Sequence, residues 1–122
     1  MLLIAAMLPD AQLADLAAQA HELGLDVLAE AHTEEEVDRL VALGLRVIGI
    51  NARDLRTFAT DLGRVRALLA RIPADRLAVA ESAIFSKADM AATGATRFLI
   101  GEALMRDPTL LGRLMADDAG EA

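Results

Sequence analysis

The sequence predicts an α/β protein built from repeated strand–helix units with a parallel sheet. Short apolar runs alternate with amphipathic stretches, glycine and proline mark the junctions between them, and no linker or change of composition divides the 122 residues. Strict alternation of strands and helices is typical of a parallel sheet covered by helices. We therefore expect residues 1–122 to form a single domain.

Five short apolar runs are the expected strands. They are rich in Leu, Ile, Val and Ala and have the length of buried strands. With only three aromatic residues in the chain, aliphatic side chains must do most of the packing. In chain order the runs are 2–7, 25–30, 46–51, 77–81 and 97–101.

Five amphipathic stretches between and after these runs are the expected helices. In the first of them, Leu13, Leu16 and Leu23 recur at helical spacing and define an apolar face. The stretches are 10–23, 33–43, 59–71, 86–93 and 107–116.

The expected helices carry start and stop signals. Asp10 is placed to cap the first helix, and Thr33 followed by Glu36 is a capping-box pattern for the second. Three glycines stand where helices are expected to end, because glycine readily adopts the left-handed conformation of a helix C-terminus. These are Gly24, Gly44 and Gly94.

Composition excludes several classes of function. The formal net charge of -7 disfavours nonspecific binding to nucleic acid, which needs a basic surface. Absence of cysteine excludes disulfides and thiolate metal sites. The apolar N-terminal stretch is too short to span a bilayer and lacks the basic region of a signal peptide. We expect a cytoplasmic protein without a membrane or nucleic-acid partner.

Two parallel architectures fit the alternation. A doubly wound, flavodoxin-like sheet needs five strands and suits this length, whereas a (β/α)8 barrel needs eight units and usually about 250 residues. The count of units alone favours the flavodoxin-like arrangement.

Polar residues and glycine stand at the ends of four expected strands. In either architecture, ligands collect at the carboxyl ends of parallel strands. Buried polar groups cost free energy unless they are paired, so packing alone does not explain their recurrence. The residues are Glu30 with His32, Asn51 with Arg53, Glu81 with Ser82, and Gly101 with Glu102.

Each of these residues also has a simpler structural interpretation. Glu30 is equally compatible with a solvated strand end, and Asn51 with a turn. Arg53 is compatible with a loop ion pair to Asp54. Ser82 is compatible with a helix cap, although Ser86 is better placed for that. The two histidines, His21 and His32, have the positions of an exposed helical residue and a loop residue.

Taken together, the strand ends indicate a site for a hydroxylated and phosphorylated small molecule. Two carboxylates, a carboxamide and a hydroxyl can hold such a substrate and move protons. The final loop, GEALM at 101–105, offers backbone N–H groups to a phosphate. No Walker-type or dinucleotide-binding glycine motif occurs, so nucleotide binding has no support.

The chain also resembles a known family. Its segments LLIAAML, HELGLDVLAEAHTEEEVDRLVALG, VIGINARDLRTFATDL, AVAESAI and FLIGEALMR are similar, in this order, to the C-terminal half of indole-3-glycerol phosphate synthase. The combination of GIN-x-R-x-L-x-T-F-x-x-D with ES-x-I is specific to that family. The resemblance implies the C-terminal part of a (β/α)8 barrel, five of eight strand–helix units, beginning at barrel strand four.

The activity that the resemblance implies is that of a carbon–carbon lyase. It closes the indole ring of a carboxyphenylamino deoxyribulose 5-phosphate with loss of CO2 and water. The step belongs to tryptophan biosynthesis and uses no cofactor and no metal. A noncatalytic α/β phosphate-binding or assembly module is the alternative.

The resemblance also implies roles for individual residues. Glu30 corresponds to a proposed proton-transfer residue, and Asn51 to the asparagine that orients the substrate. Glu81 and Ser82 correspond to a pair that contacts the hydroxylated chain of the substrate, with Glu81 among the catalytic residues. Arg53 belongs to the same motif as Asn51 and is expected to bind substrate.

Three further residues correspond to the phosphate-binding positions. Gly101 and Glu102 match the turn after the last strand. Ala83 stands where the family usually has glycine, so its backbone N–H remains but a Cβ is added. A positive φ would be strained at an alanine, which predicts weakened phosphate affinity.

The implied barrel lacks strands one to three, which carry two catalytic lysines and a glutamate in the family. Lys87, the only lysine here, matches no catalytic position. Loss of a positioned general acid typically costs about 10²–10⁴ in rate, so we expect no activity from this chain alone. Five strands would also leave two open sheet edges, which invite pairing. We expect a homo-oligomer or a complementing N-terminal half, with a rearranged flavodoxin-like monomer as the alternative.

Overall fold

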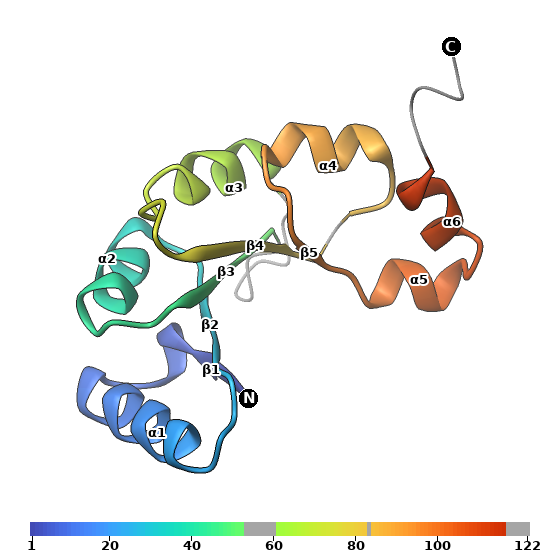
Figure 1. Cartoon of the computed structure of the whole chain (residues 1–122). Helices are drawn as coiled ribbons and strands as arrows, with labels where there is room; N and C mark the ends of the chain where they lie inside the picture. Colours follow the sequence, from blue (N-terminus) through green and yellow to red (C-terminus); the bar gives the residue numbers. More distant parts are fainter. Residues whose placement is uncertain (53–60, 83, 117–122) are drawn as a thin grey trace.

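A computed structural model of the chain describes residues 1–52, 61–82 and 84–116 (Figure 1). Within these residues, five parallel strands form one sheet, and their order in the sheet is their order along the chain. The strands are β1 (Leu2–Ile4), β2 (Leu28–Ala31), β3 (Val47–Asn51), β4 (Leu77–Glu81) and β5 (Phe98–Leu99). The predicted alternation is confirmed.

Helices follow each strand. They are α1 (Asp10–Glu22), α2 (Glu34–Ala42), α3 (Leu62–Leu69), α4 (Lys87–Thr93), α5 (Glu102–Arg106) and α6 (Leu110–Met115), with a 3-10 turn η1 (Ala5–Met7) after β1. None of these helices has the length and apolar character needed to cross a membrane. Two expectations are corrected. The strand expected at 2–7 ends at Ile4, and the GEALM loop is largely helix α5.

Side-chain caps fix where three of the helices begin. At α3, Asp61 accepts a hydrogen bond from the backbone N–H of Arg64 at 3.0 Å. Thr33 accepts a hydrogen bond from the backbone N–H of Glu36 at 3.1 Å, and Ser86 does the same for Asp89 at 3.1 Å. The expected cap at Asp10 is wrong, because Pro9 is the N-cap and Asp10 is the first helical residue. Its carboxylate instead accepts a hydrogen bond from Arg39 of α2 at 2.6 Å.

The glycine signals are confirmed. Gly24, Gly44 and Gly94 have φ values of +73°, +81° and +72°, which place all three in the left-handed region. Glycine adopts this conformation without the steric cost that a Cβ would add. These residues therefore end α1, α2 and α4 and turn the chain back towards the next strand.

The first four helices lie along the outer side of a curved sheet (Figure 1). A flavodoxin-like sheet is wound in both directions and carries helices on both faces. Here the strands lie in chain order, with these helices on one side, which is a singly wound arrangement. The flavodoxin-like alternative is therefore wrong. The partial (β/α)8 barrel is confirmed.

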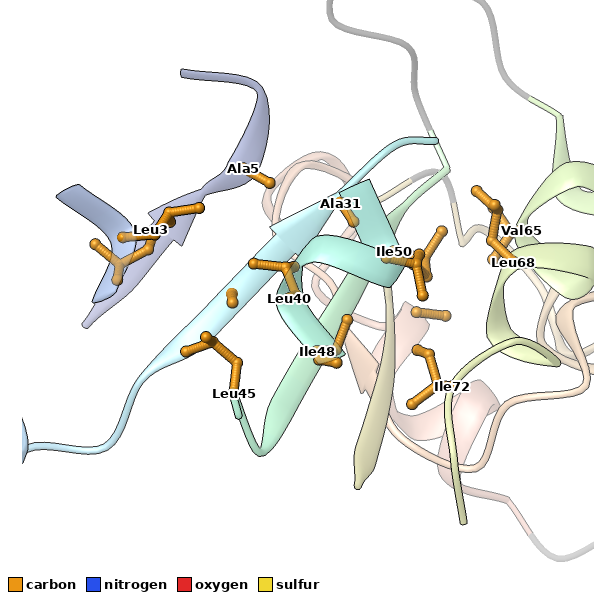
Figure 2. Packing of buried hydrophobic residues seen from close by; sticks show 14 of the residues in the cluster. Leu3, Ala5, Ala31, Leu40, Leu45, Ile48, Ile50, Val65, Leu68 and Ile72 are labelled. Carbon is orange, nitrogen blue, oxygen red and sulfur yellow. The ribbon is translucent and has the colours of Figure 1, made fainter. Parts of the chain in front are cut away.

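The main core lies between the sheet and these helices (Figure 2). Side chains on the outer face of the strands, including Ala29, Ile48 and Ile50, are fully buried. They pack in one cluster with helix residues such as Leu40 and Val65. A smaller cluster around Ile84, Ala103, Leu110 and Leu114 packs the C-terminal helices together.

The inner face of the sheet is partly open. Side chains alternate between the two faces of a strand, so the register places residues of the inner face in rows. One row is Leu2, Leu28, Val47 and Leu77, the next is Ile4, Glu30, Gly49 and Val79, and the last is Asn51, Glu81 and Leu99. Leu2, Leu77 and Leu99 keep 50%, 45% and 50% of their surface exposed.

Candidate active site

Three polar side chains meet at the carboxyl ends of neighbouring strands. Glu30 from β2, Asn51 from β3 and Glu81 from β4 are all buried on the inner face. Asn51 Nδ2 donates a hydrogen bond to Glu30 Oε1 at 2.7 Å. All three line an open pocket of about 360 Å³, together with Leu2 and Leu99 from the two edges of the sheet.

The carboxyl group of Glu81 is in an unusual environment. The residue is 3% exposed, and neither carboxyl oxygen has a hydrogen-bond partner among the described residues. Burial raises the pKa of Glu81 to about 8, and the nearby carboxylate of Glu30 adds to the shift. A protonated Glu81 can donate a hydrogen bond to Glu30, which two carboxylates cannot form. Glu81 therefore holds a proton at neutral pH.

Glu30 has a second neighbour on its own strand end. His32 Nε2 lies 3.5 Å from Glu30 Oε1, and His32 Nδ1 lies 3.7 Å from Glu36 Oε1. Glu36 is itself fixed, because its carboxylate also accepts a hydrogen bond from the backbone N–H of His32 at 2.9 Å. The loop position expected for His32 is confirmed, but its imidazole is mostly buried between two carboxylates.

Arg64 of α3 joins the ends of two strands behind the site. Its guanidinium donates to the carbonyl oxygens of His32 and Asn51, the latter at 2.8 Å. A longer contact of 3.4 Å reaches the carbonyl of Ala52. Carbonyls at strand ends lack ladder partners, so this arginine both satisfies them and holds β2 and β3 in register.

Ser82 follows Glu81 in a strained conformation. Its φ of +66° lies in the left-handed region, which is uncommon for residues other than glycine. Its backbone N–H donates to the carbonyl of Leu99 at 3.1 Å, and Ser82 lines the pocket. Ser86, rather than Ser82, caps α4. Non-glycine residues in this conformation are concentrated at functional sites.

The expected phosphate-binding positions are only partly described. Gly101 is exposed, lines the pocket and is the N-cap of α5. Glu102 begins α5, and its side chain lies outside the described part of the structure. Arg53 and Ala83 also lie outside the described residues.

Sequence reasoning missed several residues of this site. Gly49 lies beneath the Glu81 carboxyl group, Glu36 contacts His32 beside Glu30, and Arg64 donates to the backbone carbonyl of Asn51. A glycine in an otherwise apolar strand run is a detectable signal, because it marks a close approach of another group. The Glu36 contact is local, because His32 is four residues away and Glu36 belongs to the predicted capping box, whereas the Arg64 contacts depend on the packing of α3 against the sheet, which no local pattern encodes.

A singly wound parallel sheet with a carboxylate–carboxamide cluster at the strand ends defines the class of this protein: part of a barrel-type α/β fold. The sequence profile of the indole-3-glycerol phosphate synthase family matches residues 1–113. The chain belongs to that family.

Curated relatives agree with this assignment. The indole-3-glycerol phosphate synthases of Azospirillum brasilense and Paenarthrobacter aurescens are each 49% identical, over 108 and 111 residues. That of Rhodospirillum rubrum is 48% identical over 111 residues. These matches cover 86–88% of this chain but only 41–42% of the relatives. The chain therefore spans about two fifths of the length of the curated relatives it matches.

A solved structure gives independent support for the fold. One chain of the crystal structure of the Amycolatopsis orientalis BexX/CysO complex superposes with a TM-score of 0.56. The superposition covers 92% of this chain and 52% of that chain, at 20% identity. At this identity the likeness concerns the fold alone.

Proposed function

We propose that this chain forms part of the active site of an indole-3-glycerol phosphate synthase. The reaction closes the indole ring of a carboxyphenylamino deoxyribulose 5-phosphate with loss of CO2 and water, within tryptophan biosynthesis in the cytoplasm. The observation that carries the proposal is the convergence of Glu30, Asn51 and Glu81 on one pocket.

The two carboxyl groups divide the proton transfers between them. Glu81 holds a proton at neutral pH and can donate it to a carbonyl or departing hydroxyl oxygen of the substrate. Glu30 is the acceptor of the pair, oriented by the N–H of Asn51. Groups with displaced pKa values in a pocket are typical of acid–base catalysis.

The remaining residues bind the substrate in this proposal. Ser82 and Arg53 contact the hydroxylated chain, and the phosphate lies near Ala83, Gly101 and Glu102. Gly101 is exposed and stands at the start of α5, and helix starts favour phosphate binding through their backbone N–H groups. The family resemblance implies no cofactor.

The chain is proposed to be the C-terminal part of a (β/α)8 barrel and to need a complement. Both edges of the described sheet are open, and Leu2 and Leu99 beside the pocket are 50% exposed. An N-terminal half with three further strand–helix units would cover these edges. Alone, the chain is proposed to self-associate and to lack turnover.

A complementation assay tests this function. The purified chain is mixed with the separately expressed segment of the Azospirillum brasilense relative that it does not match, and ring closure is measured. We expect no turnover from either part and turnover from the mixture. Glu81→Gln should reduce that turnover by about 10² or more. His21→Gln, on the exposed side of α1, should leave it unchanged.

Two results would contradict the proposal. Turnover by the chain alone would show that its site needs no complement. Failure to bind a substrate analogue, with and without the complement, would remove the enzymatic assignment.

A noncatalytic phosphate-binding or assembly module is the second candidate. The observation that favours it is the half-exposed apolar inner face, which suits a contact with another chain. It predicts binding of inorganic phosphate or stable assembly without turnover in the same mixture.

A further inference from the structure

We propose that Gly49 is the positioning residue for Glu81. Because Gly49 has no side chain, the Glu81 carboxyl group can lie against β3 at this point. The placement of the Glu81 carboxyl against Gly49 does not depend on the function of the chain, whereas its meaning for catalysis rests on the proposed function.

The backbone does not account for this glycine. Gly49 lies in the middle of β3, paired with Glu30 of β2 and Val79 of β4. Its φ is outside the left-handed region, so any residue could adopt its conformation. Glycine in a strand interior is unfavourable, and it often marks a close approach by another group.

The approaching group is the Glu81 carboxyl. A Cβ added at Gly49 would lie 2.8 Å from Glu81 Cδ and 2.9 and 3.0 Å from its two oxygens. These separations are well below van der Waals contact, so an alanine and the present position of the carboxyl are incompatible. The other glycines among the described residues do not share this feature: the nearest atom to an added Cβ is 3.3 Å away at Gly63, and none lies within 4 Å at Gly112.

The direction in which Glu81 would move follows from its surroundings. Its carboxyl lies at the end of a flexible side chain, with the sheet on one side and the open pocket on the other. A side chain at position 49 would push the carboxyl into the pocket and towards water. The group would lose the burial that is the main cause of its raised pKa. Gly49 therefore sets both the place and the protonation of Glu81.

Carboxyl NMR on the chain itself tests this role. The ¹³C shift of the Glu81 side-chain carboxyl is followed against pH in the wild type, Gly49→Ala and Gly112→Ala. Glu81→Gln identifies the signal. We expect Gly49→Ala to lower the titration midpoint by about one pH unit or more. Gly112→Ala, the matched control, should leave it unchanged. An unchanged midpoint in a folded Gly49→Ala protein would overturn the proposal.

A double-mutant cycle covers the case in which Gly49→Ala fails to fold. In the wild-type background, Gly49→Ala should lower the folded-to-unfolded ratio about tenfold or more by overpacking. In a Glu81→Ala background, the space is free, and the same substitution should cause no loss. An equal loss in both backgrounds would contradict the role of Gly49. Neither measurement needs turnover, so failure of the complementation assay leaves this inference intact, and the reverse also holds.

Discussion

Glu81 makes the stability of the folded chain depend on pH. Its pKa is about 8 in the folded state against an ordinary value of 4.5, because burial disfavours the charged carboxylate. Between these two values the folded state holds a proton that the unfolded state releases. Stability must therefore be highest below about pH 4.5 as far as this group is concerned, and it must fall as pH rises through 8.

Glu81→Gln should remove most of this dependence. The amide has nearly the same shape, carries no charge and can donate to Glu30. We expect the urea concentration at the unfolding midpoint of the wild type to be lower at pH 8 than at pH 5. The same difference should be much smaller in the variant. Circular dichroism at several pH values measures both. Glu22→Gln is the control, because it removes the same charge from an exposed residue of α1. Parallel curves for wild type and Glu81→Gln would contradict the assignment.

The polar side chains that meet at the strand ends could be predicted from the sequence, but their surroundings could not. Glu30, Asn51 and Glu81 could be predicted to meet, because parallel strands bring their carboxyl ends to one edge. Gly49 could not be assigned, because its role depends on the register between β3 and β4 and on where the Glu81 side chain turns. The positive φ of Ser82 likewise results from the path between β4 and α4 and has no signal in residue type.

Arg64 shows how an element is fixed in place by a single side chain. It extends from α3 across the ends of β2 and β3 and donates to carbonyls of His32, Asn51 and Ala52. If this side chain were removed, the partly buried carbonyls of His32 and Asn51 would lose its hydrogen bonds, whereas that of Ala52 would keep the backbone N–H of Asp61 as a donor. Leaving such groups unsatisfied typically costs about 1–3 kcal/mol.

Arg64→Ala should therefore destabilise the chain by about 1–3 kcal/mol. Arg71→Ala is the matched control, because Arg71 follows the same helix α3 but pairs with Asp38 and Glu34 at the surface. Exposed ion pairs contribute little, so that variant should have almost wild-type stability. Urea denaturation of the two variants compares them. A similar loss in both would show that Arg64 has no special structural role.

The elements themselves were largely predictable from periodicity and caps. Thr33, Ser86 and the three left-handed glycines mark their helix ends through local hydrogen bonds and backbone conformation, which nearby residues determine. Helix α5 was missed because five residues are too few to show a helical period. Asp10 is not the cap because α1 already begins at this residue, after Pro9, and its carboxylate binds Arg39, 29 positions away.

The molecule as a whole presents an apolar inner face bounded by two open edges. β1 pairs only with β2 and β5 only with β4 among the described strands. Counting units could not reveal this arrangement, because five units fit either winding of a sheet. The family resemblance separated the alternatives because its motifs belong to a barrel, and the helices on one side of the sheet agree with it.

Association through the inner face is the expected behaviour of the chain in isolation. Light scattering after size-exclusion chromatography should show a mass that rises with protein concentration. Leu99→Lys places a charge on the inner face of the edge strand β5 and should reduce this association. Leu111→Lys, at a similarly exposed leucine of α6, should not. The reverse pattern would locate the contact on the helices, and a monomer at all concentrations would contradict association.

The order of the strands also bears on how the chain is made. Each strand pairs with the one synthesised just before it, and paired residues are separated by as few as 18 positions (Ala80 to Phe98) and at most 30 (Val47 to Leu77). Contacts of short sequence separation form quickly, and nascent chains emerge from the N-terminus onwards. The sheet can therefore form one strand at a time during synthesis, before the C-terminal residues of the chain have been made.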